Sequence, residues 1–319
     1  MNLKNKKFLI IGGAGLIGSH TVDYLLKENV KEIRIFDNFT RGKKINLNSA
    51  LKDNRVKIFE LGGDILHEEI LNEAMVGIDG VFHFAALWLL HCHNYPKSAF
   101  EVNIKGTFNV IDLCIKNNVK KLIYSSSASV YGDAISEPIK EDHPFNNKNF
   151  YGATKIASEA IIKAYHYRYG LDYIGLRYMN VYGPRQDYKG AYIAVIMKMI
   201  DSIDSGHSPV VFGTGNEAYD FIYVEDCAKA NICAMKSNKT NLMLNVGSGK
   251  KTSLKKLAST ILSLKKSDKK IIFKKSKNTT IVKNRIGFTL KAKKEIGFSF
   301  KTDLKKGLKQ TIEWKDSLK

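Results

Sequence analysis

The stretch KFLIIGGAGLIGSH (residues 7–20) decides the fold, because an apolar run passes directly into a glycine-rich turn and then into an amphipathic segment. Gly12, Gly15 and Gly18 follow one another at intervals of three residues. Glycines in such a turn allow close approach to the backbone, and the first turn of the following helix has N–H groups without partners inside the helix. The stretch therefore predicts a strand, a tight turn and a helix.

The same rhythm of short apolar runs and longer amphipathic segments continues through the first 180 residues, as in a parallel sheet flanked by helices. We expect six strands at 7–13, 32–38, 56–64, 80–86, 121–132 and 173–183, and helices at 19–29, 103–118 and 151–170. This predicts an α/β fold with a doubly wound parallel (Rossmann) sheet. A ligand of such a sheet binds where the carboxyl ends of the strands meet the amino ends of the helices.

After Pro184 the rhythm loosens, and residues 185–319 mix helices (191–203, 224–237, 254–266) with short strands (209–213, 220–224, 269–275). We expect two domains: residues 1–180 bind a dinucleotide, and residues 181–319 form a smaller α+β substrate-binding region, partly interleaved with the first.

Composition limits the class of protein. The hydrophobic fraction of 44% is that of a globular chain. No segment has the roughly 18 apolar residues needed to span a bilayer, and the start of the chain shows no signal core. Four cysteines without paired spacing favour reduced thiols and a cytoplasmic setting. We therefore expect no membrane association and no disulfides.

The formal charge of +20 is concentrated in residues 250–319, which hold 22 Lys and Arg against 5 Asp and Glu. The lysines fall in pairs between apolar residues, which favours a lysine-rich solvent face. A general attraction for anionic substrates is the next interpretation. No zinc-finger spacing, helix-turn-helix signal or aromatic platform supports nucleic-acid binding.

Asp37 ends the second expected strand, about twenty residues after the glycine turn. A carboxylate there accepts hydrogen bonds from an adenosine ribose and repels a 2′-phosphate, so NAD is favoured over NADP, although Arg41 and Lys43 lie close by. Asp64 follows the third strand, where it could accept from the adenine amino group or cap a loop.

Three polar side chains point to chemistry. Ser127 ends the fifth expected strand, and Tyr151 and Lys155 lie one helical turn apart in FYGATK (residues 150–155). A phenol is a poor base at neutral pH, but a neighbouring ammonium favours the phenolate and moves its pKa toward the useful range. The three side chains can converge on one substrate hydroxyl.

The combination of GGAGLIG, Asp37, VFHFAA, Asn103 in VNIKGTFN, SSSASVYG, YGATK and RYMNVYGPR resembles the extended short-chain dehydrogenase/reductase superfamily, and within it the nucleotide-sugar epimerases and dehydratases. The resemblance covers nearly the whole chain. It implies Ser127, Tyr151 and Lys155 as catalytic residues. It implies NAD contacts from Gly12, Gly15, Leu16, Ile17, Gly18, Asp37, Asn38, Asp64, Ile65, Ala85, Ala86, Asn103, Tyr151 and Lys155. It implies substrate contacts from Trp88, Ser127, Asn180, Arg185, Tyr219 and Arg285.

The same resemblance bears on the reaction. Dehydratases of this type carry Thr-Asp-Glu where this chain has Ser127-Ala128-Ser129, so the extra acid and base are absent. This favours 4-epimerisation of a nucleotide sugar through a transient 4-keto intermediate. Residues 185–198 resemble the corresponding segment of UDP-N-acetylhexosamine epimerases, although they could be an ordinary connecting loop. The resemblance also implies a homodimer that pairs helices near 100–118 and 152–169.

Two positions depart from the family pattern. Tyr219 stands where many relatives have an arginine that grips the nucleotide diphosphate, and the acidic residue that usually follows the glycine after Arg285 is missing. A tyrosine can donate one hydrogen bond but has no charge. The nucleotide and the sugar therefore stay open.

Other interpretations also stay open. A dehydratase, a decarboxylase or a 4-keto reductase could use the same scaffold, and a nucleotide-binding regulator without turnover is a further alternative. His91, Cys92 and His93 are adjacent, which is unsuited to one metal ion, and no metal is expected. Trp88 could line the sugar pocket or pack in the core.

Overall fold

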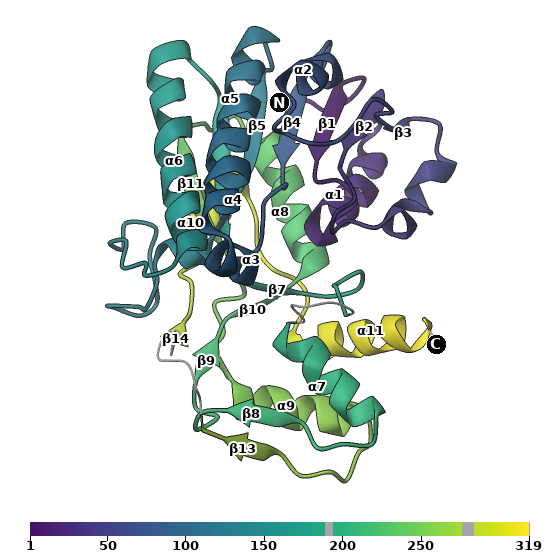
Figure 1. Ribbon diagram of the computed structural model, residues 1–319, viewed down its shortest axis with the longest axis vertical. Helices are drawn as coiled ribbons and strands as arrows, with labels where there is room; N and C mark the ends of the chain where they lie inside the picture. The colour runs from purple at the N-terminus through teal and green to yellow at the C-terminus, as the bar shows by residue number, and fades with distance from the viewer. Residues whose placement is uncertain (189–193, 276–283, 319) are drawn as a thin grey trace.

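The computed structural model describes residues 1–188, 194–275 and 284–318. Its centre is a seven-stranded parallel sheet with the order β11-β6-β5-β4-β1-β2-β3, which confirms the predicted doubly wound α/β fold (Figure 1). The strands are β1 (Lys7–Ile11), β2 (Glu32–Phe36), β3 (Val56–Ile58), β4 (Gly80–His83), β5 (Lys121–Ser127), β6 (Tyr173–Tyr178) and β11 (Leu242–Val246).

The strand order reverses between β1 and β4, which are neighbours and pair in parallel from Phe8↔Gly80 to Ile11↔His83. At such a point the loops after the two strands turn to opposite faces and leave a crevice for a ligand. All four residues of β4 and all six of β6 are buried. Burial on both faces explains their nearly continuous apolar runs.

Helices cover both faces of the sheet and enclose two separate hydrophobic cores. One face carries α1 (Leu16–Leu25), α8 (Val224–Lys236) and α10 (Leu290–Ile296), and the other carries α2 (Glu68–Met75), α5 (Thr107–Lys116) and α6 (Phe150–Tyr169). Two helices of the first face, α8 and α10, come from the second half of the chain.

The sheet differs from the expectation of six strands, because β11 is a seventh. It pairs in parallel with β6, from Leu242↔Ile174 to Val246↔Tyr178. The run at 242–246 lies inside the sequence assigned to the smaller region, and only the crossover through α8 returns it to the sheet.

All six expected strands end earlier than predicted, and two of the expected segments continue as another element. The segment 173–183 divides into β6 and β7 (Asn180–Tyr182), which leaves the sheet and pairs with β10 (Phe221–Tyr223). The segment 121–132 ends as a strand at Ser127 and continues as a 3-10 helix, Ala128–Val130. The expected helix 103–118 is a π-helix, Phe100–Gly106, followed by α5.

The smaller region has its own hydrophobic core between α7 (Val195–Asp204), α9 (Leu254–Leu264) and α11 (Leu304–Asp316). It lies below the sheet in Figure 1. Its strands form short sheets: β8 (Val210–Phe212) with β13 (Ile272–Lys274), and β9 (Ala218–Tyr219) between β12 (Thr252–Ser253) and β14 (Asn284–Arg285). The predicted helix 191–203 begins among residues 189–193, which lie outside the described residues.

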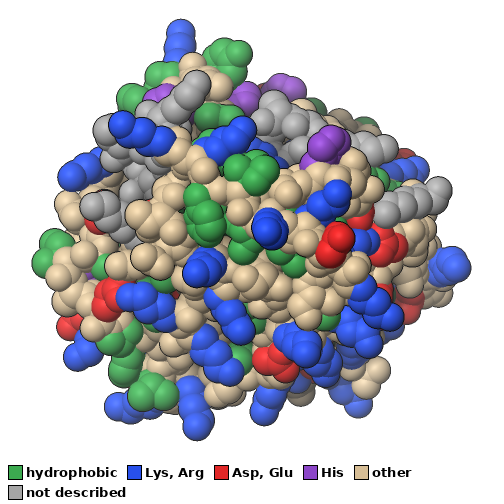
Figure 2. Space-filling model, turned by 90° about the horizontal axis from the view of Figure 1, so that it is seen from below, with side chains coloured by type: hydrophobic (Ala, Val, Ile, Leu, Met, Phe, Trp, Pro, Cys, Tyr) green, Lys and Arg blue, Asp and Glu red, His purple; other side chains and the backbone are tan. Residues whose placement is uncertain are grey.

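Lysine and arginine side chains spread over the face seen in Figure 2, with few acidic side chains among them. Of the four predicted lysine pairs between 255 and 275, every member except Lys265 is exposed, as expected for a solvent face. Lys265 contacts Asp204 at 2.6 Å and Asp316 at 3.0 Å. Within the described ranges, no helix combines the length and the apolar character needed to cross a bilayer.

Candidate active site

The glycine turn joins β1 to α1 at the point where the strand order reverses. Gly12 has a φ of +78°, and a Cβ added there would lie 2.7 Å from the backbone nitrogen of Ala85. A Cβ on Gly18 would overlap the carbonyl oxygen of Gly12. Glycine is thus required at both positions, one for a left-handed turn and one for close packing of helix on strand.

The amino end of α1 has no side-chain cap, and its first turn holds no acidic residue. Its unpaired N–H groups and the positive end of the helix dipole suit a pyrophosphate. Leu16 and Ile17, which follow Gly15, are half-buried in this first turn. The turn fits the diphosphate of NAD.

Asp37 follows β2 and faces the glycine turn. Its Oδ2 accepts from the backbone N–H of Ala14 at 2.8 Å, and its Oδ1 accepts from that of Phe39 at 2.8 Å. Burial raises the pKa of Asp37, against the lowering effect of these two hydrogen bonds. Each oxygen keeps a further lone pair for a ribose hydroxyl. Asn38 accepts from Thr40 on the exposed side of the same loop.

Four other predicted NAD contacts lie in the loops after β3 and β4. Asp64 accepts from the backbone N–H of Leu66 at 2.9 Å, as a loop cap does, and Ile65 is buried against α5 and the π-helix. Ala85 and Ala86 follow β4, where the N–H of Ala85 donates to the Ile11 carbonyl at 3.2 Å.

Asn103 is buried in the π-helix, and its side-chain amide makes hydrogen bonds within the protein. Its Oδ1 accepts from the N–H of Leu87 at 2.7 Å, and its Nδ2 donates to the Leu87 carbonyl at 3.1 Å and to Thr154 at 3.2 Å. The amide thus fixes the loop after β4 against α6.

The predicted trio comes from two elements that meet at one edge of the sheet. Ser127 ends β5, and its hydroxyl accepts from the N–H of Ser129 at 3.1 Å. Tyr151 is half-buried in the first turn of α6, which Asn149 caps by accepting from Gly152. The Nζ of Lys155 lies 5.8 Å from the centre of the Tyr151 ring.

Lys155 is almost completely buried, with 3% of its surface exposed. Its Nζ donates to the carbonyl of Ser125 at 2.7 Å and lies 4.9 Å from the Tyr124 ring centre. Burial lowers the pKa of Lys155 to about 8, although Cys92 and Glu159 act to raise it. Its ammonium therefore remains the main form at neutral pH.

Gly152 lies beside the candidate catalytic tyrosine, where the packing admits only glycine. A Cβ there would lie 2.5 Å from the carbonyl oxygen of Ser129. The glycine lets the start of α6 pack directly on the 3-10 helix after β5, which brings Tyr151 toward Ser127. The residue stands inside the YGATK motif, so the signal was present but was assigned to its neighbours.

Three predicted substrate residues gather around the short strands of the smaller region. Asn180 begins β7, and its Nδ2 donates to the Asp220 carbonyl at 3.1 Å. Arg285 pairs with Tyr219 in register between β14 and β9. Burial raises the pKa of Tyr219, while the charge of Arg285 acts to lower it. The tyrosine and the arginine thus lie side by side on paired strands.

Asp220 was not predicted and organises this unit. It is fully buried, and its carboxylate accepts from the N–H and hydroxyl of Ser248 at 2.7 and 2.6 Å, from Gly249 at 2.9 Å and from Gly287 at 3.4 Å. It therefore joins the loops after β11 and β14 beside Arg285.

Arg185 and Trp88 lie away from that unit. The Nη2 of Arg185 pairs with Asp23 on α1 at 2.7 Å, which anchors the loop after β7 to the first domain. The guanidinium carbon of Arg41 lies over the Trp88 ring, 4.5 Å from the ring centre. Arg41 and Lys43 also lie 4.0 and 3.7 Å from Asp187, so both basic groups near Asp37 face a carboxylate.

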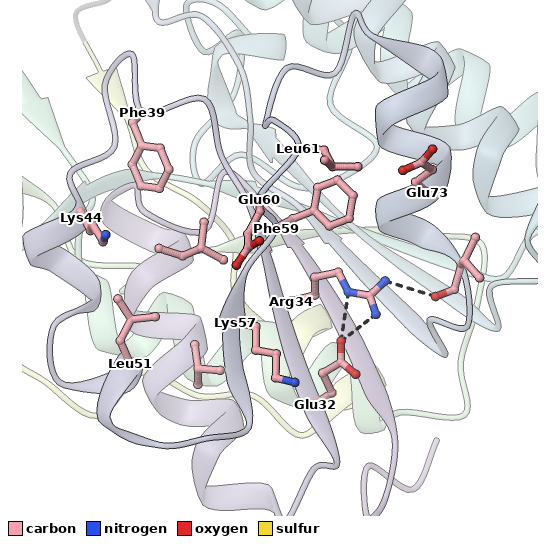
Figure 3. Close-up of a pocket in the computed structure, with 13 residues that line it drawn as sticks. Glu32, Arg34, Phe39, Lys44, Leu51, Lys57, Phe59, Glu60, Leu61 and Glu73 are labelled. Carbon is pink, nitrogen blue, oxygen red and sulfur yellow. Dashed lines mark hydrogen bonds and ion pairs between the residues drawn. The ribbon is translucent and has the colours of Figure 1, made fainter.

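A hollow of about 990 Å³ lies along the edge strand β3, lined among others by Arg34, Phe39 and Leu61 (Figure 3). None of its lining residues is a predicted site residue, and it lies on the outer edge of the sheet. In the described part of the chain, no group of His, Cys, Asp and Glu side chains is arranged to hold a metal ion. Cys92 between the two histidines is buried and contacts Asn103.

The fold and the site define a dinucleotide-binding α/β enzyme with a tyrosine and a lysine on one turn of a helix. The model of the NAD dependent epimerase/dehydratase family matches residues 8–247, and the chain belongs to this family. NAD is its cofactor, and the residues around the glycine turn fit it.

Three relatives are similar over most of their length. UDP-N-acetylglucosamine 4-epimerase from Methanobrevibacter ruminantium M1, solved in complex with UDP-N-acetylmuramic acid, has a TM-score of 0.93 and 35% identity, over 99% of this chain and 100% of that one. UDP-glucose 4-epimerase from Thermotoga maritima, solved with UDP-glucose, has a TM-score of 0.91 and 31% identity, over 98% and 100%. A UDP-N-acetyl-alpha-D-glucosaminuronate decarboxylase from Bacillus cytotoxicus is 33% identical over 80% of this chain and 79% of its own.

Proposed function

We propose that this chain catalyses the NAD-dependent 4-epimerisation of a UDP-sugar, with UDP-N-acetylglucosamine or UDP-glucose as the substrate. The observation that carries the proposal is the end of β5, where Ser127 is followed by Ala128 and Ser129 and by no carboxylate. The full-length similarity to two UDP-sugar 4-epimerases supports it. An acid and a base for removal of water are missing from this position.

The residues have the following roles. NAD, when bound, supplies a reversible acceptor of hydride from C4 of the sugar. Tyr151 as phenolate removes the proton of the C4 hydroxyl, and Ser127 donates a hydrogen bond to the same oxygen. Lys155 stabilises the phenolate through its charge. After the 4-keto sugar has turned over, Tyr151 returns the proton to the oxygen at the inverted carbon.

The nucleotide is held by the smaller region. Arg285 supplies positive charge for the diphosphate, Tyr219 one hydroxyl, and Asn180 lies at the start of β7 between them and the sheet. Arg185 acts indirectly, because its guanidinium pairs with Asp23. Trp88 covers the sugar end of the crevice.

The alternative is a decarboxylase, a dehydratase or a 4-keto reductase on the same scaffold, which the similarity to a decarboxylase favours over a regulator without turnover. A decarboxylase and a dehydratase also begin by transfer of hydride from the sugar to NAD and differ in the later steps. A 4-keto reductase instead transfers hydride from NADH to the C4 carbonyl and consumes the cofactor.

Purified protein incubated with UDP-N-acetylglucosamine, UDP-glucose, UDP-glucuronic acid and the GDP- and TDP-sugars, with and without added NADH, distinguishes these reactions by proton NMR. We expect interconversion of the 4-epimers of a UDP-sugar with no net change in NADH. Loss of water, release of carbon dioxide or net consumption of NADH would each refute epimerisation and identify one of the alternatives.

We also propose that the protein is a cytoplasmic homodimer. Phe100, Phe108 and Tyr169 are each about half-exposed on the π-helix, α5 and α6, the helices predicted to pair. The four cysteines are free thiols, as a reducing compartment requires. Light scattering of the wild type and of Phe108→Glu tests the dimer, which the added charge should dissociate.

A further inference from the structure

A buried ion pair lies directly behind the candidate catalytic residues. Glu159 follows Lys155 by one turn of α6, and Arg177 lies in β6; only 6% and 4% of their surfaces are exposed. The Nε of Arg177 donates to Oε1 of Glu159 at 2.9 Å, and Nη2 donates to Oε2 at 2.6 Å. Such pairs are seldom more stable than well-packed apolar side chains, so stability alone does not account for it.

Glu159 also holds the end of β5. Its Oε1 accepts from the hydroxyl of Ser126 at 2.5 Å. Ser126 lies between Ser125, whose carbonyl binds the Lys155 ammonium, and Ser127. One carboxylate therefore fixes the segment that positions two of the three candidate catalytic groups.

Arg177 connects the same carboxylate to the rest of the sheet. Its Nη1 donates to the Tyr131 hydroxyl at 2.7 Å and to the Glu141 carbonyl at 2.9 Å. Tyr131 in turn donates to Oδ1 of Asn245 in β11 at 2.7 Å. The network joins α6, β5, β6 and β11 and contacts the Ser125–Ser127 segment through Glu159.

We propose that Glu159, held by Arg177, is a positioning residue for hydride transfer, which sets the geometry of Ser125–Ser127 and of the Lys155 ammonium bound to that segment. The inference rests on the proposed roles of Ser127, Tyr151 and Lys155. Glu159 does not touch the substrate and acts through these residues.

The electrostatic part of this role depends on the groups that face Lys155. They come from every element packed around it: Cys92 on α3, Tyr124 on β5, His83 on β4, and Tyr151 and Glu159 on α6. Burial lowers the pKa of Lys155, and of these groups Cys92 and Glu159 oppose it. The Cys92 thiol is neutral at physiological pH because burial raises its pKa, whereas the Glu159 carboxylate forms an ion pair with Arg177 at 2.6 Å.

Glu159→Gln keeps the size of the side chain and removes its charge. Loss of an opposite charge lowers the pKa of a neighbouring lysine by about one or more. In the pH–rate profile of hydride transfer, the decline on the alkaline side, the alkaline limb, should then move from about pH 8 to about pH 7. The charged fraction of Lys155 at pH 8 falls about fivefold. The rate is followed by the fluorescence of bound NADH after the holoenzyme is mixed with a UDP-sugar.

Two variants separate positioning from stability. Glu159→Gln with Arg177→Met leaves no buried unpaired charge and should recover thermal stability but not the rate or the alkaline limb. Asp204→Asn breaks a comparable buried contact, to Lys315 at 2.9 Å, and should lower stability without moving the limb. If the double variant regains both the stability and the wild-type rate and limb, the proposal is overturned.

NAD affinity measured across pH gives a readout without any sugar. It should weaken above about pH 8 in the wild type and about one pH unit lower in Glu159→Gln, because the Lys155 ammonium is one of the expected NAD contacts. Identical curves would overturn the proposal. If Glu159→Gln shows this shift in NAD affinity but the wild type epimerises no sugar, the proposed function is refuted and the role of Glu159 is supported.

Discussion

Asp220 gives a sharp test of how the smaller region is held in place. The change Asp220→Asn replaces one carboxylate oxygen by an NH₂ group. If the remaining side-chain oxygen still accepts the hydrogen bonds from Ser248, the new NH₂ group faces the backbone N–H groups of Gly249 and Gly287, which then lose their acceptor. In this fully buried site the NH₂ group and the two N–H groups are all donors, so their hydrogen bonds are not satisfied.

The magnitude follows from those contacts. Each buried donor without a partner costs about 1–3 kcal/mol, so we expect a loss of about 3 kcal/mol in the free energy of unfolding. For a chain of this size that corresponds to roughly 4–5 °C in Tm. Because the loops beside Arg285 are released, KM for the UDP-sugar should also rise, while NAD affinity changes little.

The assay is denaturant unfolding together with initial rates, with Asp303→Asn as the matched control. Asp303 caps α11 by accepting from Lys306 at 3.0 Å, and asparagine caps helices about as well as aspartate. The control should stay within about 0.5 kcal/mol of the wild type. A loss below about 1 kcal/mol for Asp220→Asn, or an equal loss in the control, would refute the reasoning.

Three further predictions concern the first domain. Gly18→Ala should weaken NAD binding at least about tenfold while circular dichroism shows a folded protein, because the new Cβ overlaps the Gly12 carbonyl; unchanged affinity in a titration would contradict this. Tyr151→Phe should keep NAD binding but slow the appearance of bound NADH by about 10²–10⁴, and a wild-type rate would show that another group is the base. His20 is buried, with Nε2 3.1 Å from the Pro184 carbonyl, and burial lowers its pKa to about 4. The unfolded chain takes up this proton first as the pH falls, so the contribution is complete above about pH 6.5 and declines toward pH 4. The difference in free energy of unfolding between wild type and His20→Asn should shrink by about 2 kcal/mol between pH 7 and pH 5, and a constant difference would show that His20 is not held neutral.

Much of the site could be predicted from sequence because it is local. The glycine turn, Asp37 and the pair Tyr151 and Lys155 depend on spacing within one strand–turn–helix unit or one helical turn, and such spacing is visible in the chain itself. The residues missed act over long separations. Glu159 and Arg177 are 18 residues apart, Tyr131 and Asn245 are 114 apart, and Asp220 binds loops 28 and 67 residues away.

The sequence alone determined the α/β class, the dinucleotide turn and the identity of the candidate catalytic residues, because backbone sterics and helix periodicity act between near neighbours. Only the tertiary structure decided that β11 completes the sheet, that β7 leaves it, and that Arg185 pairs with Asp23. Pairing of strands and of buried charges depends on which surfaces the folded chain brings together, and apolar runs such as 242–246 do not specify their partners.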